Sequence, residues 1–279
     1  MTKTVGIVAR IDRKEALTLA TALADKFQTK GFKVLMEQNL AKHLNWIEGS
    51  SPIEEMNTTL VVTIGGDGTI LRTCLRLPKP EPPVLPIDMG VRGFLTEVTP
   101  ESALEAVEKY LKKEYTVETC SKLASFIGNI RLPDALNEVL VTSRELAKLL
   151  HVKVLKNNNP IVDCRADGVI ISSQVGSTGY TLSAGGPILD PELDAFVLTP
   201  ICPITFMRPI VFSASSQVGV KILNPKKVKV VIDGDYQKLI DKKEHSVLVK
   251  KSEYKSSFIR FEGHFYQRLK VRLFSKEED

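Results

Sequence analysis

The sequence predicts an α/β N-terminal domain with a parallel sheet, followed by a mostly antiparallel all-β C-terminal domain. Three observations lead to this fold class. In the N-terminal part, short apolar runs alternate with amphipathic helical patterns, which is typical of β-α-β units. From about Tyr115 onwards, short β-rich runs separated by turn residues replace that alternation, as in antiparallel sheets. The chain has 279 residues, 43% of them hydrophobic, which is enough for two packed cores.

The chain begins with a β-α-β unit. Residues 4–9 form a short apolar strand, and residues 14–30 carry apolar side chains at helical spacing. After Gly31, residues 33–37 form a second strand. Such a unit places its strands parallel, with a right-handed crossover. The next strand, residues 60–64, is continuously apolar, which is typical of strands covered on both faces.

A glycine-rich turn follows this strand. It reads Gly65-Gly66-Asp67-Gly68-Thr69. A helical pattern then continues as far as Pro78, a further strand is expected at residues 84–89, and an amphipathic helix at residues 101–113. The order strand, glycine turn and helix brings the N-terminal amides of a helix to a phosphate.

The second half of the chain carries the antiparallel strands. They are expected at residues 138–142, 152–155, 168–172, 218–222, 228–232 and 246–250. Strands are also expected at residues 258–261 and 269–274, which either close this domain or return to the first. We therefore place an α/β domain at residues 1–105 and an all-β domain at residues 106–264, and residues 265–279 can rejoin the α/β domain.

Composition excludes several classes of protein. Lys and Arg number 38 against 33 Asp and Glu, and the basic residues are scattered. Nucleic acid is therefore not an expected partner, whereas a phosphate-rich small molecule suits the modest positive field. The cysteines and histidines lack the spacing of zinc ligands, so we expect a reduced, cytoplasmic environment. No run of about 18 apolar residues occurs, and neither export nor a membrane span is expected.

The glycine-rich turn is the first motif that carries chemistry. Phosphate oxygens must come within hydrogen-bond distance of backbone N–H groups, and a Cβ would block that approach. Asp67, in the middle of this loop, is placed to accept a proton from an attacking hydroxyl, as in other phosphoryl-transfer sites. A tight strand-to-helix turn with a capping aspartate is the alternative.

Residues 167–187 form a second motif. A strand leads into a loop dense in glycine and small hydroxylated residues. Such a loop lets a flat base lie against the backbone while hydroxyls and carbonyls bind its edge. A glycine-rich turn without a ligand is the alternative.

In combination, these motifs resemble those of the NAD kinase family. The glycine–aspartate loop, the pair Asn137-Glu138, Asp167-Gly168 and residues 176–189 occur in the family's order and spacing, over nearly the whole chain. The loop alone is shared with diacylglycerol kinase, sphingosine kinase and phosphofructokinase relatives. The combination is specific to NAD kinases.

The resemblance implies transfer of the terminal phosphoryl group of ATP, or of polyphosphate, to the adenosine-ribose 2′-hydroxyl of NAD. It implies a phosphate-binding α/β domain, a dinucleotide-binding β domain and an active site in the crevice between them. Mg²⁺, or another divalent cation, is expected to arrive with ATP, bound mostly by water and phosphate. A homodimer or homotetramer, in which a neighbour completes the pocket, is also implied.

The family's roles carry over to the first motif residue by residue. Asp67 resembles the general base on the ribose hydroxyl. Arg72, about one helical turn later, resembles the family's basic contact to phosphate. Backbone amides stabilise the transferred charge. The loop residues around the phosphate are Gly65, Gly66, Gly68 and Thr69.

The second domain is expected to hold the dinucleotide. Asn137 and Glu138 match the pair that holds ribose hydroxyls, since buried donors must find acceptors; a strand-edge charge facing water is the alternative for Glu138. Arg165 and Asp167 match positions that flank the dinucleotide. Tyr180 can stack on a ring while its hydroxyl stays in water, with a core position as the alternative. The stretch that touches adenine and the far nucleotide is matched by Thr178, Gly179, Tyr180 and Ser183.

Several positions depart from the family pattern. Ser173-Gln174-Val175 replaces the family's Thr-Pro-Thr. Val175 is still expected to be a binding residue, but its side chain cannot supply the hydroxyl of the family's threonine. Gly179 replaces alanine. The family's asparagine, histidine and glutamine are replaced by Asp88, Ile204 and Asp235. Added carboxylates near phosphate cost affinity unless a cation neutralises them, so these changes bear on the acceptor, and NAD and NADH both stay open.

Two other functions fit parts of the sequence. Another kinase with the same loop, acting on a lipid or a different nucleoside, would leave Asn137-Glu138 and residues 176–187 unexplained. A non-catalytic dinucleotide sensor would retain binding and lose turnover.

Overall fold

The computed structural model describes residues 3–90, 93–145, 148–205, 207–224, 227–240, 245–261 and 265–274. Contacts divide the chain into two units, of which the first is Met1–Thr119 with Ser256–Asp279 and the second is Cys120–Lys255. Strands β6 (Thr116–Ile127) and β17 (Ser246–Arg260) each contribute residues to both units. We propose these two units as the domains of the protein.

The first unit contains a parallel sheet, as predicted. Its strand order is β3-β2-β1-β4-β5, and every neighbouring pair in this order is parallel. Strand β4 lies inside this order and is buried along its whole length, which explains its continuous apolar run. The strands are β1 (Thr4–Ala9), β2 (Lys33–Glu37), β3 (Ser50–Ser51), β4 (Leu60–Gly65) and β5 (Val84–Asp88).

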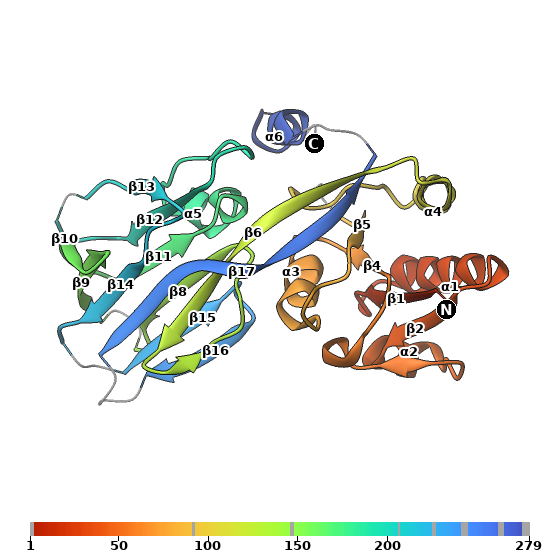
Figure 1. The fold of residues 1–279 in the computed structure, drawn as a ribbon, viewed down its shortest axis with the longest axis horizontal. Helices are drawn as coiled ribbons and strands as arrows, with labels where there is room; N and C mark the ends of the chain where they lie inside the picture. Colours follow the sequence, from red (N-terminus) through yellow and green to blue (C-terminus); the bar gives the residue numbers. More distant parts are fainter. Residues whose placement is uncertain are drawn as a thin grey trace. The chain divides into compact units, whose positions relative to one another are not determined.

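Helices pack on this sheet (Figure 1). Helix α1 (Lys14–Thr29) contacts β1, β2 and β4, and α4 (Ala103–Lys112) contacts α1. Helix α3 (Asp67–Arg76) contacts β4 and β1. Helix α2 (Gln38–Leu44), which was not predicted, contacts β2, and a short 3-10 turn, η1 (Ile53–Glu55), contacts α3. The predicted β-α-β unit is confirmed.

The C-terminal segment is helical, so the strand predicted at residues 269–274 is wrong. Helix α6 spans Phe265–Phe274 and belongs to the first unit. Residues 269–273 alternate apolar and basic, which imitates a strand, but Phe265, Leu269 and Leu273 recur at intervals of four, the spacing of one helix face. The helical spacing extends over the whole of α6, whereas the alternation covers only five residues, and the segment forms a helix. None of the described helices is long and apolar enough to cross a membrane.

The second unit is built mainly from antiparallel strands, as predicted. One sheet has the order β13-β12-β11-β8-β15-β16. Its strands are β8 (Glu138–Ser143), β11 (Gly168–Ser172), β12 (Ala195–Ile201), β13 (Ile210–Ser213), β15 (Val228–Ile232) and β16 (Tyr236–Ile240). A second antiparallel set has the order β10-β9-β14-β17. It comprises β10 (Asn159–Ala166), β9 (Leu150–Lys156), β14 (Val218–Ile222) and the first part of β17, and β7 (Ile130–Arg131) pairs with the end of β6.

Candidate active site

The glycine–aspartate turn joins β4 to α3. Gly65 is the last residue of β4, Gly66 is the N-cap of α3, and Asp67 is the first residue of that helix rather than the middle of a loop. Gly66 has no side chain with which to cap the first amides of α3. An anion can take the position that a capping oxygen usually occupies.

The three glycines of this turn are explained in different ways. A Cβ on Gly65 would lie 2.2 Å from Thr69 Oγ1, so packing within the chain requires glycine there. A Cβ on Gly66 or Gly68 would meet no described atom within 4 Å, and neither residue has a positive φ. Close approach of a ligand to the backbone would explain the glycines at these two positions.

The Asp67 carboxylate is held by the loop that follows β5. Phe94 N donates to Oδ2 at 2.9 Å and Leu95 N donates to Oδ1 at 3.0 Å. A Cβ on Gly93 would lie 2.1 Å from Oδ1, so the loop closes tightly on the carboxylate. Asp67 is half-buried, and backbone amides contact both of its carboxylate oxygens.

Asp88, one of the departures from the family pattern, accepts hydrogen bonds from two residues of the same loop. Its Oδ1 accepts from Gly90 N at 3.1 Å and its Oδ2 accepts from Thr96 Oγ1 at 3.3 Å. Gly93 N in turn donates to Thr96 Oγ1 at 3.1 Å. Burial, with a contribution from the charge of Asp67, raises the pKa of Asp88 against these hydrogen bonds. Asp88 is therefore a buried anchor of the loop that binds Asp67.

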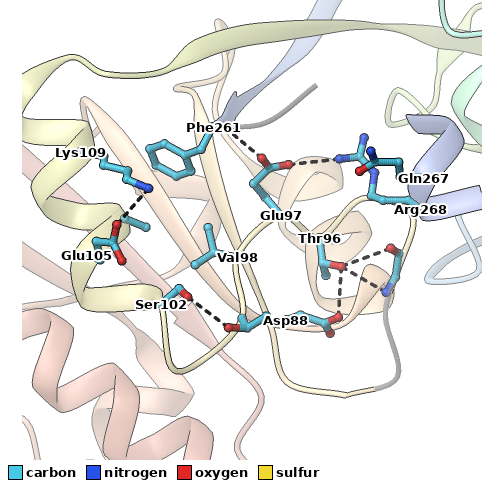
Figure 2. A pocket seen from close by; sticks show the side chains of 13 residues that line it. Asp88, Thr96, Glu97, Val98, Ser102, Glu105, Lys109, Phe261, Gln267 and Arg268 are labelled. Carbon is cyan, nitrogen blue, oxygen red and sulfur yellow. Dashed lines mark hydrogen bonds and ion pairs between the residues drawn. The ribbon is translucent and has the colours of Figure 1, made fainter. Parts of the chain in front are cut away.

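A pocket of about 390 Å³ borders this loop within the first unit (Figure 2). Glu97 lines it and accepts a hydrogen bond from Arg268 Nη1 of α6 at 3.1 Å. Figure 2 shows Lys109 and Glu105 of α4 on the other side of the pocket from Arg268. Thr96 also lines the pocket, so the pocket shares a wall with the segment that holds Asp67.

Arg72 lies on α3 in the turn after Asp67. Its Nε is buried and has no hydrogen-bond partner among the described residues. A buried guanidinium nitrogen without an acceptor is destabilising. A phosphate oxygen would supply that acceptor.

In the second unit, Asn137 and Glu138 lie at the start of β8. Strand β8 is flanked by β11 and β15, and Glu138 is 8% exposed, so a strand-edge charge facing water is excluded. Burial, and to a lesser extent the charge of Asp233, raises the pKa of Glu138 to about 8. Within the described chain, Asn137 Oδ1 and Glu138 Oε2 are buried without a hydrogen-bond partner. Both oxygens are available to hydroxyl donors of a ligand.

The glycine-rich segment after β11 packs against this pair. It forms a 3-10 turn, η2 (Val175–Thr178), and a short helix, α5 (Tyr180–Ser183). A Cβ on Gly176 would lie 2.2 Å from the Asn137 carbonyl oxygen, and a Cβ on Gly179 would lie 3.0 Å from Asn137 Nδ2. These close approaches bring the segment and the pair into one site.

Side chains of this segment differ in exposure. Val175 cannot donate a hydroxyl, but its carbonyl accepts from Thr178 Oγ1 at 3.0 Å, and Thr178 is buried. Tyr180 is 43% exposed, so it is not a core tyrosine. Ser183 is exposed at the end of α5. The ring of Tyr180 is therefore accessible to a ligand.

Arg165 and Asp167 lie at the end of β10 and in the link to β11. Both are exposed, at and just after β10. The β8–β11 ladder extends from Gly168, beside Asp167, to Ser172, which pairs with Glu138. The four residue steps between these ends span about 14 Å. Asp167 and Glu138 therefore lie at opposite ends of this ladder.

Asp233 is a site residue that the sequence analysis did not identify. Its carboxylate accepts hydrogen bonds from the backbone amides of Leu136, Asn137 and Glu138 at 2.7, 2.8 and 3.0 Å. In the sequence, Asp233 is marked by the dipeptide Asp233-Gly234, which indicates a hairpin turn. That signal carries no information about the side chain.

Two of the departures lie at the surface. Ile204 is 62% exposed, and Asp235 is also exposed. Among the residues that the structure describes, no group of three or more His, Cys, Asp and Glu side chains is placed to hold a metal ion.

Sequence comparisons identify relatives of both units. The ATP-NAD kinase N-terminal domain family matches residues 5–115, and the ATP-NAD kinase C-terminal domain family matches residues 136–261. The NAD kinase of Methanothermobacter thermautotrophicus is 41% identical over 272 residues, which cover 96% of this chain and 95% of that protein. The NAD kinase of Thermococcus kodakarensis is 37% identical, with 97% and 99% covered.

Two solved structures are similar to this one. An NAD kinase from Archaeoglobus fulgidus in complex with ATP has a TM-score of 0.80 at 30% identity, covering 96% of this chain and 98% of that chain. Yeast NADH kinase complexed with NADH has a TM-score of 0.89 at 22% identity, covering 100% and 89%. With both domain families matched in order and the archaeal relatives aligned almost end to end, this chain belongs to the NAD kinase family.

Proposed function

We propose that the protein is an NAD kinase, which transfers the terminal phosphoryl group of ATP to the adenosine-ribose 2′-hydroxyl of NAD and yields NADP and ADP. The observation that carries this proposal is the glycine turn. Gly66 and Gly68 face open space without a backbone requirement for glycine, next to a carboxylate that two amides orient. Phosphate approach to a helix N-terminus beside a proton acceptor calls for this arrangement.

Asp67 is the group that we assign to proton transfer. As the 2′-oxygen attacks the γ-phosphorus, its proton passes to the Asp67 carboxylate. The new O–P bond forms while the bond from phosphorus to the leaving oxygen of ADP breaks, and Asp67 later releases the proton to water. Phe94 N and Leu95 N keep the carboxylate oriented during this step.

Phosphate charge is assigned to α3. Gly66 and Gly68, at the start of α3, leave open space beside the backbone, and the buried Nε of Arg72 needs an acceptor. Donors held in place before the reaction stabilise developing charge without reorganisation. Arg72 and the α3 amides are therefore the expected contacts of the transferred phosphoryl group.

A divalent cation, expected to be Mg²⁺, belongs to the ATP substrate and neutralises phosphate charge. The side chains present suit an ion held mainly by phosphate and water. Both oxygens of Asp67 accept amide hydrogens, and both oxygens of Asp88 accept hydrogen bonds from the same loop. These carboxylates anchor the loop rather than form a cage for a metal ion.

Asn137 and Glu138 are assigned to the ribose of the acceptor. Glu138, with its pKa raised to about 8, is mostly protonated at neutral pH, so its carboxyl group can donate as well as accept. The unpartnered Asn137 Oδ1 adds an acceptor. Gly179 leaves room beside both side chains, and Tyr180 offers an exposed ring for stacking.

We also propose that the enzyme is a homo-oligomer of the cytoplasm. Asp167 adjoins the end of the β8–β11 ladder far from Glu138, and Arg165 precedes it at the end of β10. We assign them to the dinucleotide bound by a second copy, as in a dimer or tetramer. Isolated cysteines without disulfide or zinc spacing favour a reduced compartment.

The direct test is to incubate pure protein with ATP, Mg²⁺ and NAD and to measure NADP with an NADP-specific dehydrogenase. NADP formation is expected. Parallel reactions with polyphosphate and with NADH identify the donor and the acceptor. A kinase of a lipid or another nucleoside would form no NADP and bind NAD weakly, whereas a dinucleotide sensor would bind NAD tightly without turnover, and either outcome overturns the proposal.

A further inference from the structure

Asp233 takes no part in the proton and phosphate steps described above, yet it is 7% exposed and lies between β15 and β16. We propose that Asp233 is a positioning residue for the acceptor, which fixes the backbone of residues 136–138 and thereby orients Asn137 and Glu138 towards the ribose. This inference rests on the proposed function. It deepens that function by assigning acceptor affinity to a residue that touches no substrate.

The hydrogen bonds of Asp233 all converge on one short segment. Oδ2 accepts from Leu136 N at 2.7 Å, and Oδ1 accepts from Asn137 N at 2.8 Å and from Glu138 N at 3.0 Å. Asp233 N donates back to the Glu138 carbonyl at 3.2 Å. Hydrogen bonds to an ionised carboxylate are shorter and stronger than neutral ones. Four bonds thus define where β8 begins.

This segment depends on Asp233 because the sheet does not satisfy its amides. Strand β8 begins at Glu138, so Leu136 N and Asn137 N precede the ladder. Buried backbone amides require acceptors. On its other side, the segment is held by Ser173, whose Oγ donates to the Leu136 carbonyl at 2.5 Å and whose amide donates to the Asn137 carbonyl at 2.8 Å. The backbone is therefore fixed from both sides.

The side chains on this fixed backbone are the ones with unused acceptors. Asn137 Oδ1 and Glu138 Oε2 are buried without a partner in the described chain, although the amides of both residues are bonded. Backbone amides that all have acceptors, combined with side-chain oxygens that lack donors, are typical of a preorganised binding site. Loosening the backbone would misdirect both oxygens at once.

The hairpin turn allows the carboxylate to be tested apart from the turn. Asp233 has φ +48° and Gly234 has φ +72°, the signs of a type I′ turn, for which asparagine is as suitable as aspartate. Asp233→Asn therefore keeps the turn and the shape of the side chain. It replaces one carboxylate oxygen by an NH₂ group, which faces an amide donor instead of accepting from it.

Asp233 also acts on Glu138 through charge. The charged groups that face Asp233 are Glu138 on β8 and the fully buried Lys122 on β6. The negative charge of Asp233 contributes to the raised pKa of Glu138, so neutralising Asp233 lowers that pKa. The pH dependence of NAD binding should then shift to lower pH, an effect that loss of packing alone would not produce.

The experiment compares steady-state kinetics of wild type and Asp233→Asn, with NAD and ATP varied separately and NAD titrated by calorimetry from pH 6 to 9. For Asp233→Asn we expect the KM for NAD to rise at least ~10-fold, the scale of losing a hydrogen bond to a charged group. The KM for ATP and kcat at saturating NAD should change less than ~3-fold. The control is Asp163→Asn, an exposed carboxylate of the same unit on β10, which should match wild type.

Ser173→Ala provides a second variant in case Asp233→Asn does not fold. It removes the hydroxyl that holds Leu136 from the opposite side, so it should raise the KM for NAD and spare the KM for ATP. The proposed role of Asp233 is overturned if folded Asp233→Asn has an unchanged KM for NAD, or if its KM values for NAD and ATP rise equally. If Asp233→Asn does not fold, either of these results in Ser173→Ala overturns the role instead. Absence of NADP formation by wild type overturns the proposed function instead, so the two failures are distinct.

Discussion

Two residues of the loop after β5 hold the carboxylate of Asp67, which we assign to proton transfer. Phe94 N and Leu95 N each donate to a different oxygen of Asp67. A carboxylate has about four lone-pair positions, and these two bonds fix the orientation of the group. The side chain is aimed by backbone amides, which cannot rotate away as side-chain partners can.

Asp67→Asn tests this assignment directly. The amide keeps the shape of the side chain and loses its basicity, so kcat should fall at least ~100-fold, the usual scale for removing an acid–base group. The Kd for NAD, measured by calorimetry, should stay within about twofold of wild type because Asp67 is assigned to proton transfer rather than acceptor affinity. Turnover close to that of wild type would reject Asp67 as the base.

The raised pKa of Glu138 predicts that the free energy of unfolding depends on pH. Its pKa is raised from 4.5 to about 8 in the folded chain, so its contribution to stability is present in full below pH 4.5, declines as pH rises, and is lost above about pH 8. Asp233, whose pKa burial raises to about 6 against three amide hydrogen bonds, acts in the same direction at lower pH. The interval from pH 6 to 8 therefore isolates Glu138.

Glu138→Gln should remove the decline within that interval. The Tm of the variant relative to wild type should rise between pH 6 and pH 8 and level off above, by about 2–4 °C for each kcal/mol in a chain of this size. Scanning calorimetry across this range provides the measurement. A difference in Tm that does not vary with pH would show that Glu138 titrates normally.

At the scale of elements, the loop from β5 to α4 connects two carboxylates. Asp88 binds Gly90 and Thr96 of this loop, and Asp67 binds Phe94 and Leu95. The same stretch lines the pocket shown in Figure 2. Strain introduced anywhere in the tight part of the loop should therefore reach Asp67, which we assign to proton transfer.

Gly93→Ala and Gly90→Ala form a matched pair for this loop. A Cβ on Gly93 would lie 2.1 Å from Asp67 Oδ1, whereas one on Gly90 would meet no described atom within 4 Å. Gly93→Ala should lower kcat at least ~10-fold, since misplacing a catalytic group by about 1 Å costs up to ~100-fold. Gly90→Ala should stay within about twofold. Equal kcat values for the two variants would contradict tight closure of the loop on Asp67.

Helices and strands were predictable where the spacing of apolar residues is regular over the whole element. The strands and helix at the start of the chain coincide with the predicted ranges within one residue. Helix α6 was mistaken for a strand because five of its residues alternate apolar and basic. Helix α3 begins at Asp67, earlier than its apolar pattern indicates, although the flanking Gly66 and Gly68 have weak helix propensity.

At the scale of the whole molecule, the residues that we assign to phosphate and to the acceptor lie in different units. Asp67 and Arg72 lie in the first, and Asn137, Glu138 and Asp167 lie in the second. Within the second, strand register separates Asp167 from Glu138 by the length of a ladder. The family pattern assigns both residues to a dinucleotide, and we propose that a neighbouring copy supplies Asp167.

Mixing two inactive variants tests shared sites. Asp67→Asn lacks the base, and Asp167→Ala lacks the contact expected from a neighbouring copy, so each should be slow alone at limiting NAD. After subunit exchange, a dimer should regain about a quarter of the wild-type activity, because half of the dimers are hybrids with one complete site each. Activity that stays at the sum of the separate variants would show that Asp167 does not act between copies.

The sequence by itself determined the order of the α/β and antiparallel regions, the glycine–aspartate turn, and the Asn137-Glu138 pair. Local periodicity and motif spacing depend only on residues close in sequence, so these features can be predicted from the sequence. Only the tertiary structure decided that Asp233 binds the Leu136 amide, 97 residues away, that Phe94 and Leu95 hold Asp67, and that Asp167 lies far from Glu138. Those outcomes depend on which strands pair and in what register, and neighbouring residues do not encode that choice.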